Sequence, residues 1–371
     1  MPAMTAIREK IVVERIDGFS AVRDSVEAEL DCAGVSLPVP HRARWQRECV
    51  QGVCDSIMFV ARADGRPVAA LSASISRSRA LPRHRIYGVE RWSGSGATDA
   101  DAALLVEVAN AACHDFLCLR ATIELFSFDA SVRRGHQARL IELGFERAAV
   151  ARMYERTLAI DLTPGEDEIF ARLHAKARRD VRAAGKKGFV VSPIVDRSFG
   201  DRLAALVGES FRRTGTAPDE TPWDRIIQLS ADNPAISRVV GMFDPRAAGA
   251  DALVAFAWGC SHGAYATYNA GGSTRGPSVG NVPLSYAPLW DLIMWAKRST
   301  GARMFDLGGV TANDPEDPRH GITEFKRYFS SDVVDVGEEW TLTTAPIRAA
   351  VARVISRGAK RASGAVPVQT V

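Results

Sequence analysis

Hydrophobic and polar positions in the first half of the chain alternate between strand-like and helix-like spacing. Two apolar runs flank the short turn Asp64-Gly65-Arg66-Pro67, an arrangement typical of a β-hairpin. Further along, apolar residues recur every three to four positions, as on one face of a helix. In chain order the predicted elements are a helix near the N-terminus, a helix or loop at 41–53, strands at 56–63, 68–76 and 84–92, a helix at 99–117, a strand at 121–128, a helix at 132–143 and a strand pair ending at residue 162.

The second half of the chain repeats this order after a break at Thr163-Pro164-Gly165. Its predicted elements are helices at 169–188 and 199–213, strands at 236–243, 252–260 and 264–269, a helix at 283–297 and a strand at 304–307. The repetition predicts a mixed α/β (α+β) fold built from two copies of one unit, at 1–162 and 163–345. A basic helical tail follows at 346–371. The chain contains no long heptad segment, so no coiled-coil arm is expected.

Composition narrows the class of protein. The chain has 371 residues, of which 46% are hydrophobic and 25% charged, values that suit a globular enzyme of two domains. Charged residues interrupt the first 19 positions and no later run approaches a membrane span, so we expect a cytoplasmic protein without an integral membrane segment. The six cysteines are expected to be free thiols, and the scattered histidines predict no metal site.

The most informative local motif lies near the end of the second unit. An apolar strand ends in Asp306-Leu307-Gly308-Gly309, and a short helix carrying Phe325-Lys326 follows after a polar loop. The glycines allow a sharp turn and a close approach to a ligand at a strand end, where α/β sheets gather their sites. Lys326 is a cation able to meet a phosphate or an oxyanion. The alternative is that Asp306 caps the turn and Lys326 is a solvated helix residue.

Positive charge is concentrated in two segments although the net charge is only +3. The segment 172–187 places Arg178, Arg179 and Arg182 on one predicted helix, where they either track RNA or pyrophosphate oxygens or form a solvated face. The tail after Ile347 carries Arg348, Arg353, Arg357, Lys360 and Arg361 without an acid. Its aliphatic residues at helical spacing predict a helix packed on the body of the protein. Contact of this basic tail with anionic lipid or RNA is the alternative.

Several segments in a shared order resemble known families. The order of elements is similar to the acyltransferase fold called GNAT, in two tandem domains. A narrower resemblance, to the Fem family (FemABX-like) of peptidoglycan bridge-forming aminoacyltransferases, spans roughly residues 50–345. The segments that carry it are the cationic helix between Phe170 and Phe189, Tyr265 to Ala270, the helix 289–297, the strand and Phe325-Lys326 helix described above, and 139–145 with 157–162 in the first half.

The resemblance implies an activity and a set of site residues. Fem-like proteins transfer an amino acid from aminoacyl-tRNA to an amine of a peptidoglycan precursor, nucleotide-linked or lipid-linked, without a cofactor. By resemblance Lys326 would stabilise the oxyanion or meet the terminal tRNA phosphate, and Asp306 or the substrate itself would deprotonate the amine. Phe325 would stack on the terminal adenine, and Tyr268 would donate to a carbonyl or sugar, unless both are ordinary core aromatics. The further expected substrate-binding residues are Gly308, Gly309, Arg178, Arg182 and Arg213.

Two other functions stay open. One is a GNAT-type N-acyltransferase that uses acyl-CoA or acyl carrier protein in polysaccharide or natural-product biosynthesis. Such enzymes carry an Arg/Gln-x-x-Gly-x-Gly/Ala turn before a helix, and the nearest candidate, Arg133 to Gln137, lacks the second small residue. The other is a binding protein that keeps the fold without the chemistry. The departures from the Fem pattern, Asn269 in place of a glycine and no clear Arg and Tyr within 217–225, leave acceptor recognition undefined.

Overall fold

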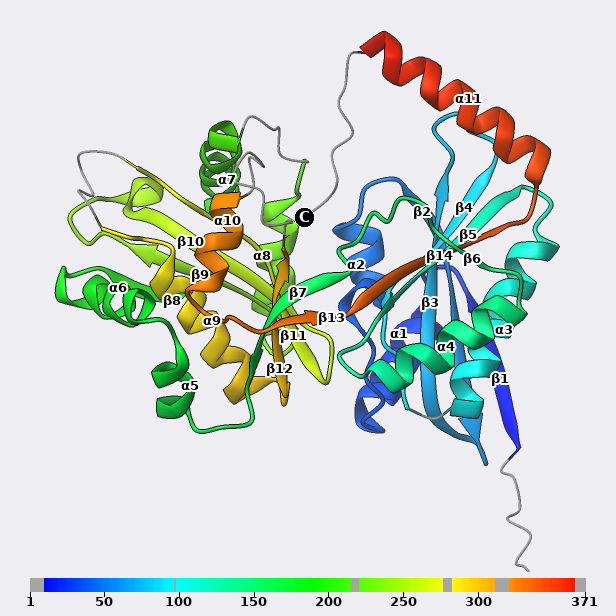
Figure 1. The fold of residues 1–371 in the computed structure, drawn as a ribbon, viewed down its shortest axis with the longest axis horizontal. Helices are drawn as coiled ribbons and strands as arrows, with labels where there is room; N and C mark the ends of the chain where they lie inside the picture. Colours follow the sequence, from blue (N-terminus) through cyan, green and yellow to red (C-terminus); the bar gives the residue numbers. More distant parts are fainter. Residues whose placement is uncertain (1–9, 97, 215–219, 276–281, 311–319, 364–371) are drawn as a thin grey trace, which may run out of the picture. The chain divides into compact units, whose positions relative to one another are not determined.

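The computed structural model describes residues 10–96, 98–214, 220–275, 282–310 and 320–363. Contacts divide these residues into two compact units. The first unit contains residues 10–153 and 336–363, and the second contains residues 154–335 (Figure 1). Each unit has its own seven-stranded sheet, so the chain consists of two α/β units.

The first unit is a sheet in the order β1-β2-β3-β4-β5-β14-β6. Its one parallel pair is β4 with β5, and the remaining neighbours run antiparallel. The elements are β1 (Ile11–Asp17), α1 (Ala21–Cys32), α2 (Ala43–Glu48), β2 (Val53–Ala63), β3 (Arg66–Arg77), β4 (Arg85–Trp92), α3 (Thr98–His114), β5 (Cys118–Phe126), α4 (Ala130–Glu142), β6 (Glu146–Arg147), β14 (Gly337–Thr343) and α11 (Pro346–Ser363).

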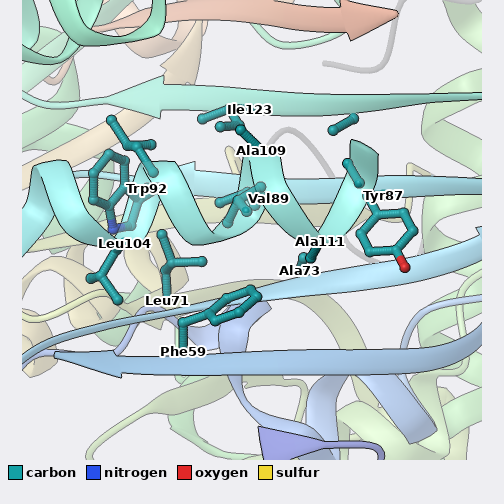
Figure 2. Close-up of a cluster of buried hydrophobic side chains, with 14 of the residues drawn as sticks. Phe59, Leu71, Ala73, Tyr87, Val89, Trp92, Leu104, Ala109, Ala111 and Ile123 are labelled. Atoms are coloured by element: carbon teal, nitrogen blue, oxygen red, sulfur yellow. The ribbon is translucent and has the colours of Figure 1, made fainter. Parts of the chain in front are cut away.

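Alternation along the strands gives this sheet two buried faces. Because successive side chains of a strand point to opposite faces, Phe59 of β2 packs with Leu104 of α3, whereas Met58 packs with Leu30 of α1. Figure 2 shows the larger cluster, in which Trp92 and Val89 of β4 and Leu71 of β3 lie against helix α3. Helices α3 and α4 therefore cover one face and α1 the other.

The second unit has the sheet order β13-β7-β12-β11-β10-β9-β8. Its parallel pair is β11 with β12. The elements are β7 (Arg156–Asp161), α5 (Glu166–Arg172), α6 (Ala175–Lys186), β8 (Val190–Pro193), α7 (Gly200–Thr214), α8 (Trp223–Asp232), β9 (Ser237–Phe243), β10 (Leu253–Ser261), β11 (Tyr265–Ser273), α9 (Tyr286–Ser299), β12 (Met304–Gly309), α10 (His320–Arg327) and β13 (Val333–Asp335). One face packs on α9, and the other receives Trp223 of α8 against Phe256 and Trp258.

The two sheets correspond strand for strand, and each takes its sixth strand from the other half of the sequence. β14, drawn in orange because it lies near the end of the sequence, pairs with β5 of the first unit (Figure 1). β7, from the end of the first half, pairs with β12 of the second unit. The unit boundaries therefore differ from those expected at residues 162 and 345. Residues 154–162 lie in the second unit, and residues 336–345 lie in the first.

Most predicted elements are present, but several predictions were wrong. The strand pair predicted to end at residue 162 does not form, because β6 lies in the first sheet and β7 in the second. The N-terminal helix is preceded by β1, which pairs along its whole length with β2. The single helix predicted at 169–188 is two helices, because Leu173 and His174 are extended and the His174 imidazole accepts a hydrogen bond from the amide of Lys176. The tail forms α11, but its aliphatic side chains stay exposed, from 44% at Ile355 to 82% at Ile347.

Candidate active site

The parallel strands β11 and β12 separate in the middle of the second sheet. Their pairing begins at Tyr265 with Met304 and ends at Thr267 with Asp306. β11 continues to Ser273 with a bulge against β10, and β12 continues to Gly309. In the first unit the corresponding strands β4 and β5 stay paired as far as Trp92 with Leu125. The separated strands of the second unit leave peptide groups without a ladder partner on the neighbouring strand, which is where a ligand can bind.

Asp306 is fully buried at this point and organises the end of β12. Its Oδ1 accepts the amide hydrogen of Gly308 at 2.8 Å and the hydroxyl of Thr157. Its Oδ2 accepts the hydroxyl of Tyr154 and, at 3.3 Å, that of Thr267. Both carboxylate oxygens are thus occupied, and the side chain is 0% exposed. This geometry favours a positioning role, because direct removal of a substrate proton would require one of these partners to leave.

The two glycines after Asp306 are each required at their position for a different structural reason. Gly308 has a φ of +82°, the left-handed region that side-chain-bearing residues avoid. A Cβ at Gly308 would also lie 3.1 Å from Nζ of Lys326. At Gly309 a Cβ would lie 2.7 Å from Cβ of Tyr154. The glycines therefore bring the β12 backbone next to the ammonium group on one side and the Tyr154 ring on the other.

Lys326 extends from α10 to this turn as a buried cation. It is 2% exposed, and its Nζ donates to the carbonyl of Gly309 at 2.8 Å. Burial lowers the pKa of Lys326 from 10.5 to about 8, while the negative charge of Asp306 opposes the shift. An ammonium has three hydrogens, and Gly309 is the one hydrogen-bond acceptor seen for it among the described residues. A cation held at this turn can stabilise an anionic atom of a ligand.

The aromatic candidates lie beside the turn in different settings. Phe325 is half-buried and packs edge-on against Tyr286, with ring centroids 5.1 Å apart, and against Phe329. It is thus part of a core aromatic cluster, and base stacking by Phe325 stays a prediction. Tyr268 follows the last residue of β11 that pairs with β12, and its hydroxyl lies close to Gly271, where a Cβ would come within 2.3 Å of it. Burial raises the pKa of Tyr268, so its hydroxyl stays protonated and can donate.

The cationic candidates on α6 are engaged in local contacts. Arg178 donates to the carbonyls of Ala171 and Leu173, which end α5. Arg182 is exposed and places its guanidinium 4.8 Å from the ring centre of Phe170. Neither contacts Lys326 or Asp306 in the part of the chain that the structure describes. The side chain of Arg213 lies outside the described residues, so its expected role stays a prediction.

Sequence reasoning missed the residues that complete this site. Tyr154 and Thr157 hold Asp306 from positions about 150 residues earlier in the chain, and no local pattern marks them. Lys176 also belongs to the cationic segment 172–187, and no local pattern sets it apart there. Its Nζ donates to Asp180 and Tyr286 and lies 4.5 Å from the centre of the Tyr286 ring. It thereby joins α6 to the aromatic cluster beside Phe325.

Sequence reasoning also missed a glycine turn in the first unit. The stretch Arg91-Trp92-Ser93-Gly94-Ser95-Gly96 begins with the last two residues of β4 and leads towards α3. It matches the Arg-x-x-Gly-x-Gly pattern that the segment at Arg133 lacks. Such a turn offers backbone amides to a diphosphate. Here the carboxylate of Asp101, which is 1% exposed, accepts the amides of Ser95 at 2.9 Å and Gly96 at 3.2 Å. The Asp101 carboxylate therefore already accepts the amide hydrogens that would bind a diphosphate.

The first unit also holds partly or fully buried carboxylates on adjacent strands. Glu124 of β5 lies opposite Glu339 of β14 in the strand register. Burial, together with the charge of Glu90, raises the pKa of Glu124 to about 7, and burial raises the pKa of Glu90 as well. Glu339 is paired with Arg152 at 3.1 Å. Within the described residues, no group of three or more His, Cys, Asp and Glu side chains could hold a metal ion.

No described helix is both long and apolar enough to cross a lipid bilayer.

No family model matches the sequence, and no curated protein matches it. Solved structures do match. FemX aligns with 91% of this chain and 100% of its own at 13% identity and a TM-score of 0.70.

Two further structures align over most of their length. One is a tandem GNAT protein from the clavulanic acid biosynthesis pathway, with 13% identity, a TM-score of 0.49 and coverage of 90% of this chain and 99% of its own. The other is a conserved protein of unknown function from Bacteroides thetaiotaomicron, with 12% identity, a TM-score of 0.49 and coverage of 86% and 96%. The match to FemX shows that this chain has a Fem-like fold of two tandem GNAT-like units.

Proposed function

We propose that this protein is an acyltransferase that forms an amide bond on an amine acceptor. The observation that carries the proposal is Lys326, a buried ammonium that donates to the carbonyl of Gly309 beside the separated strands β11 and β12. With a pKa of about 8, Lys326 is mostly protonated at neutral pH. A fixed cation in a dry site stabilises a developing oxyanion strongly. The Fem-like fold agrees with this chemistry.

The proposed reaction needs few groups from the protein. The neutral amine attacks the carbonyl of an activated ester or thioester, and the new C–N bond forms as the oxyanion approaches Lys326. Collapse of this intermediate breaks the bond to the alcohol or thiol, which leaves with a proton. Asp306 holds Gly308, Thr157 and Tyr154 in place rather than contacting the amine. Loss of the amine proton to the substrate or solvent is therefore the route we propose.

For the donor we propose the aminoacyl end of a tRNA, and for the acceptor an amine of a peptidoglycan precursor in the cytoplasm. The resemblance to Fem proteins and the Fem-like fold support this choice. Acyl-CoA is the alternative donor, and acyl carrier protein offers the same thioester. The amides of Ser95 and Gly96 already donate to Asp101, which argues against CoA binding at this turn of the first unit. The Asp101 carboxylate would also repel a diphosphate there.

The test is a donor screen with the purified full-length protein. Labelled aminoacyl-tRNA, acetyl-CoA and acyl carrier protein thioester are each mixed with a nucleotide-linked or lipid-linked precursor. We expect label to move to the acceptor amine from aminoacyl-tRNA. Transfer from a thioester alone would instead assign the N-acyltransferase function, and binding of donors without any transfer would assign a binding protein.

Two measurements connect the activity to Lys326. Replacing Lys326 with Ala should lower the rate at least about ten-fold, whereas Lys187→Ala, which changes an exposed lysine, should leave it unchanged. The wild-type rate should also fall as pH rises through about 8, because the ammonium is the active form. An unchanged rate in Lys326→Ala would remove this side chain from the mechanism.

A further inference from the structure

Helix α11 contacts the first unit at its beginning. It starts at Pro346, directly after β14, and Ala345 before it is buried. Nη1 of Arg348 donates to the carbonyl of Phe116 at 2.6 Å, and the guanidinium lies 4.3 Å from the centre of the Phe116 ring. These contacts set the direction in which the helix leaves the sheet (Figure 1).

The apolar face of α11 is exposed along the helix. Ile347 is 82% exposed, Val351 48%, Val354 69% and Ile355 44%. These positions follow the spacing i, i+4, i+7 and i+8, so they form one stripe. Phe116, which is 78% exposed, lies beside the first turn. Soluble surfaces rarely expose a continuous group of large aliphatic and aromatic side chains, and such a group marks an interaction surface.

The charge of this segment defines the chemistry of its partner. From residue 346 to the end of the sequence there are five basic residues and no acidic one: Arg348, Arg353, Arg357, Lys360 and Arg361. An exposed aliphatic stripe on a basic helix matches the surface of an anionic bilayer, where the stripe enters the acyl chains and the cations meet lipid phosphates. RNA would satisfy the cations but would leave the stripe in water.

We propose that α11, together with Phe116, binds the surface of an anionic lipid bilayer. The 18-residue helix lies in the plane of the interface, with Ile347, Val351 and Val354 directed to the acyl chains. The inference on lipid binding does not depend on the proposed function. That the acceptor amine is carried on a lipid does rest on the proposed function, because a transferase bound to the bilayer surface would meet such an acceptor there.

Vesicle flotation with the full-length protein tests the proposal. Vesicles of phosphatidylcholine alone are compared with vesicles that also contain phosphatidylglycerol. We expect the protein to float with the anionic vesicles, less so at high salt, and to ignore the neutral ones. The double variant Ile347→Asp/Val354→Asp should lower this binding at least about ten-fold, since two aliphatic side chains no longer enter the acyl chains. Arg353→Gln, at an exposed arginine, should lower it by about five-fold.

The control is Ile141→Asp, which places one aspartate at a 61% exposed isoleucine on α4, away from α11. It should bind vesicles as the wild type does. All variants change exposed side chains, so circular dichroism and thermal unfolding should be unaltered. Equal vesicle binding by the double variant and the wild type would overturn the proposal. So would binding of labelled RNA without vesicle binding, or self-association through α11 without vesicle binding.

Discussion

Replacing Lys326 with Met tests whether a buried ammonium limits the stability of the second unit. The pKa of Lys326 falls from 10.5 to about 8 on folding because burial disfavours the charge. Each pKa unit corresponds to about 1.4 kcal/mol, so below pH 8 the protonated side chain destabilises the folded state by about 3 kcal/mol. The unfolded chain binds the proton more tightly, and stability therefore rises with pH from about 8 to about 10.5.

Methionine keeps much of the length of the side chain and has no proton to lose. The free energy of unfolding of the wild type, minus that of Lys326→Met, should therefore increase by about 3 kcal/mol between pH 7.5 and 10.5. Urea unfolding followed at several pH values measures this difference, in which the other titrating groups cancel. Lys187→Met, at an exposed lysine, is the control and should track the wild type. A difference that stays constant with pH would refute the account of Lys326 as a buried cation with a lowered pKa.

Two other substitutions test the turns. Gly308→Ala should lower the free energy of unfolding by about 1–2 kcal/mol through its positive φ, and further through crowding against Lys326. Gly301→Ala is the control for the backbone conformation, because Gly301 has a φ of +70° and no atom lies within 4 Å of the added Cβ. If both variants lose the same free energy of unfolding in urea, crowding against Lys326 does not contribute at Gly308. Asp101→Ala should cost about 2–3 kcal/mol because the hydrogen bonds from the Ser95 and Gly96 amides to a carboxylate are lost. Asp99→Ala, at an exposed carboxylate in the same helix turn, should cost about 0.5 kcal/mol in the same assay, and similar losses would contradict the role of Asp101.

The chain order of most elements could be predicted from the sequence because it depends on local spacing. The hairpin of β2 and β3, the helix α3 and the strand β12 all lie within a few residues of their predicted bounds. The glycine turn after Asp306 was predicted for the same reason, since Gly308 adopts a conformation that favours glycine. The local signal was weaker where helix and strand patterns compete, as at β1 and at the break after Arg172.

Strand exchange between the units depended on tertiary structure. A strand sequence determines the alternation of its side chains but does not specify the sheet in which the strand pairs. The boundaries drawn at residues 162 and 345 follow the chain, whereas hydrogen bonding to β12 and β5 decides where these strands belong.

By itself the sequence determined the succession of elements, the glycine turn and the identity of the charged residues near it. Only the tertiary structure decided their environment. It buried Lys326, surrounded Asp306 with Tyr154 and Thr157 from a distant part of the chain, and left the apolar face of α11 exposed. Burial and pairing arise from contacts between residues far apart in sequence, and spacing along the chain carries no record of them.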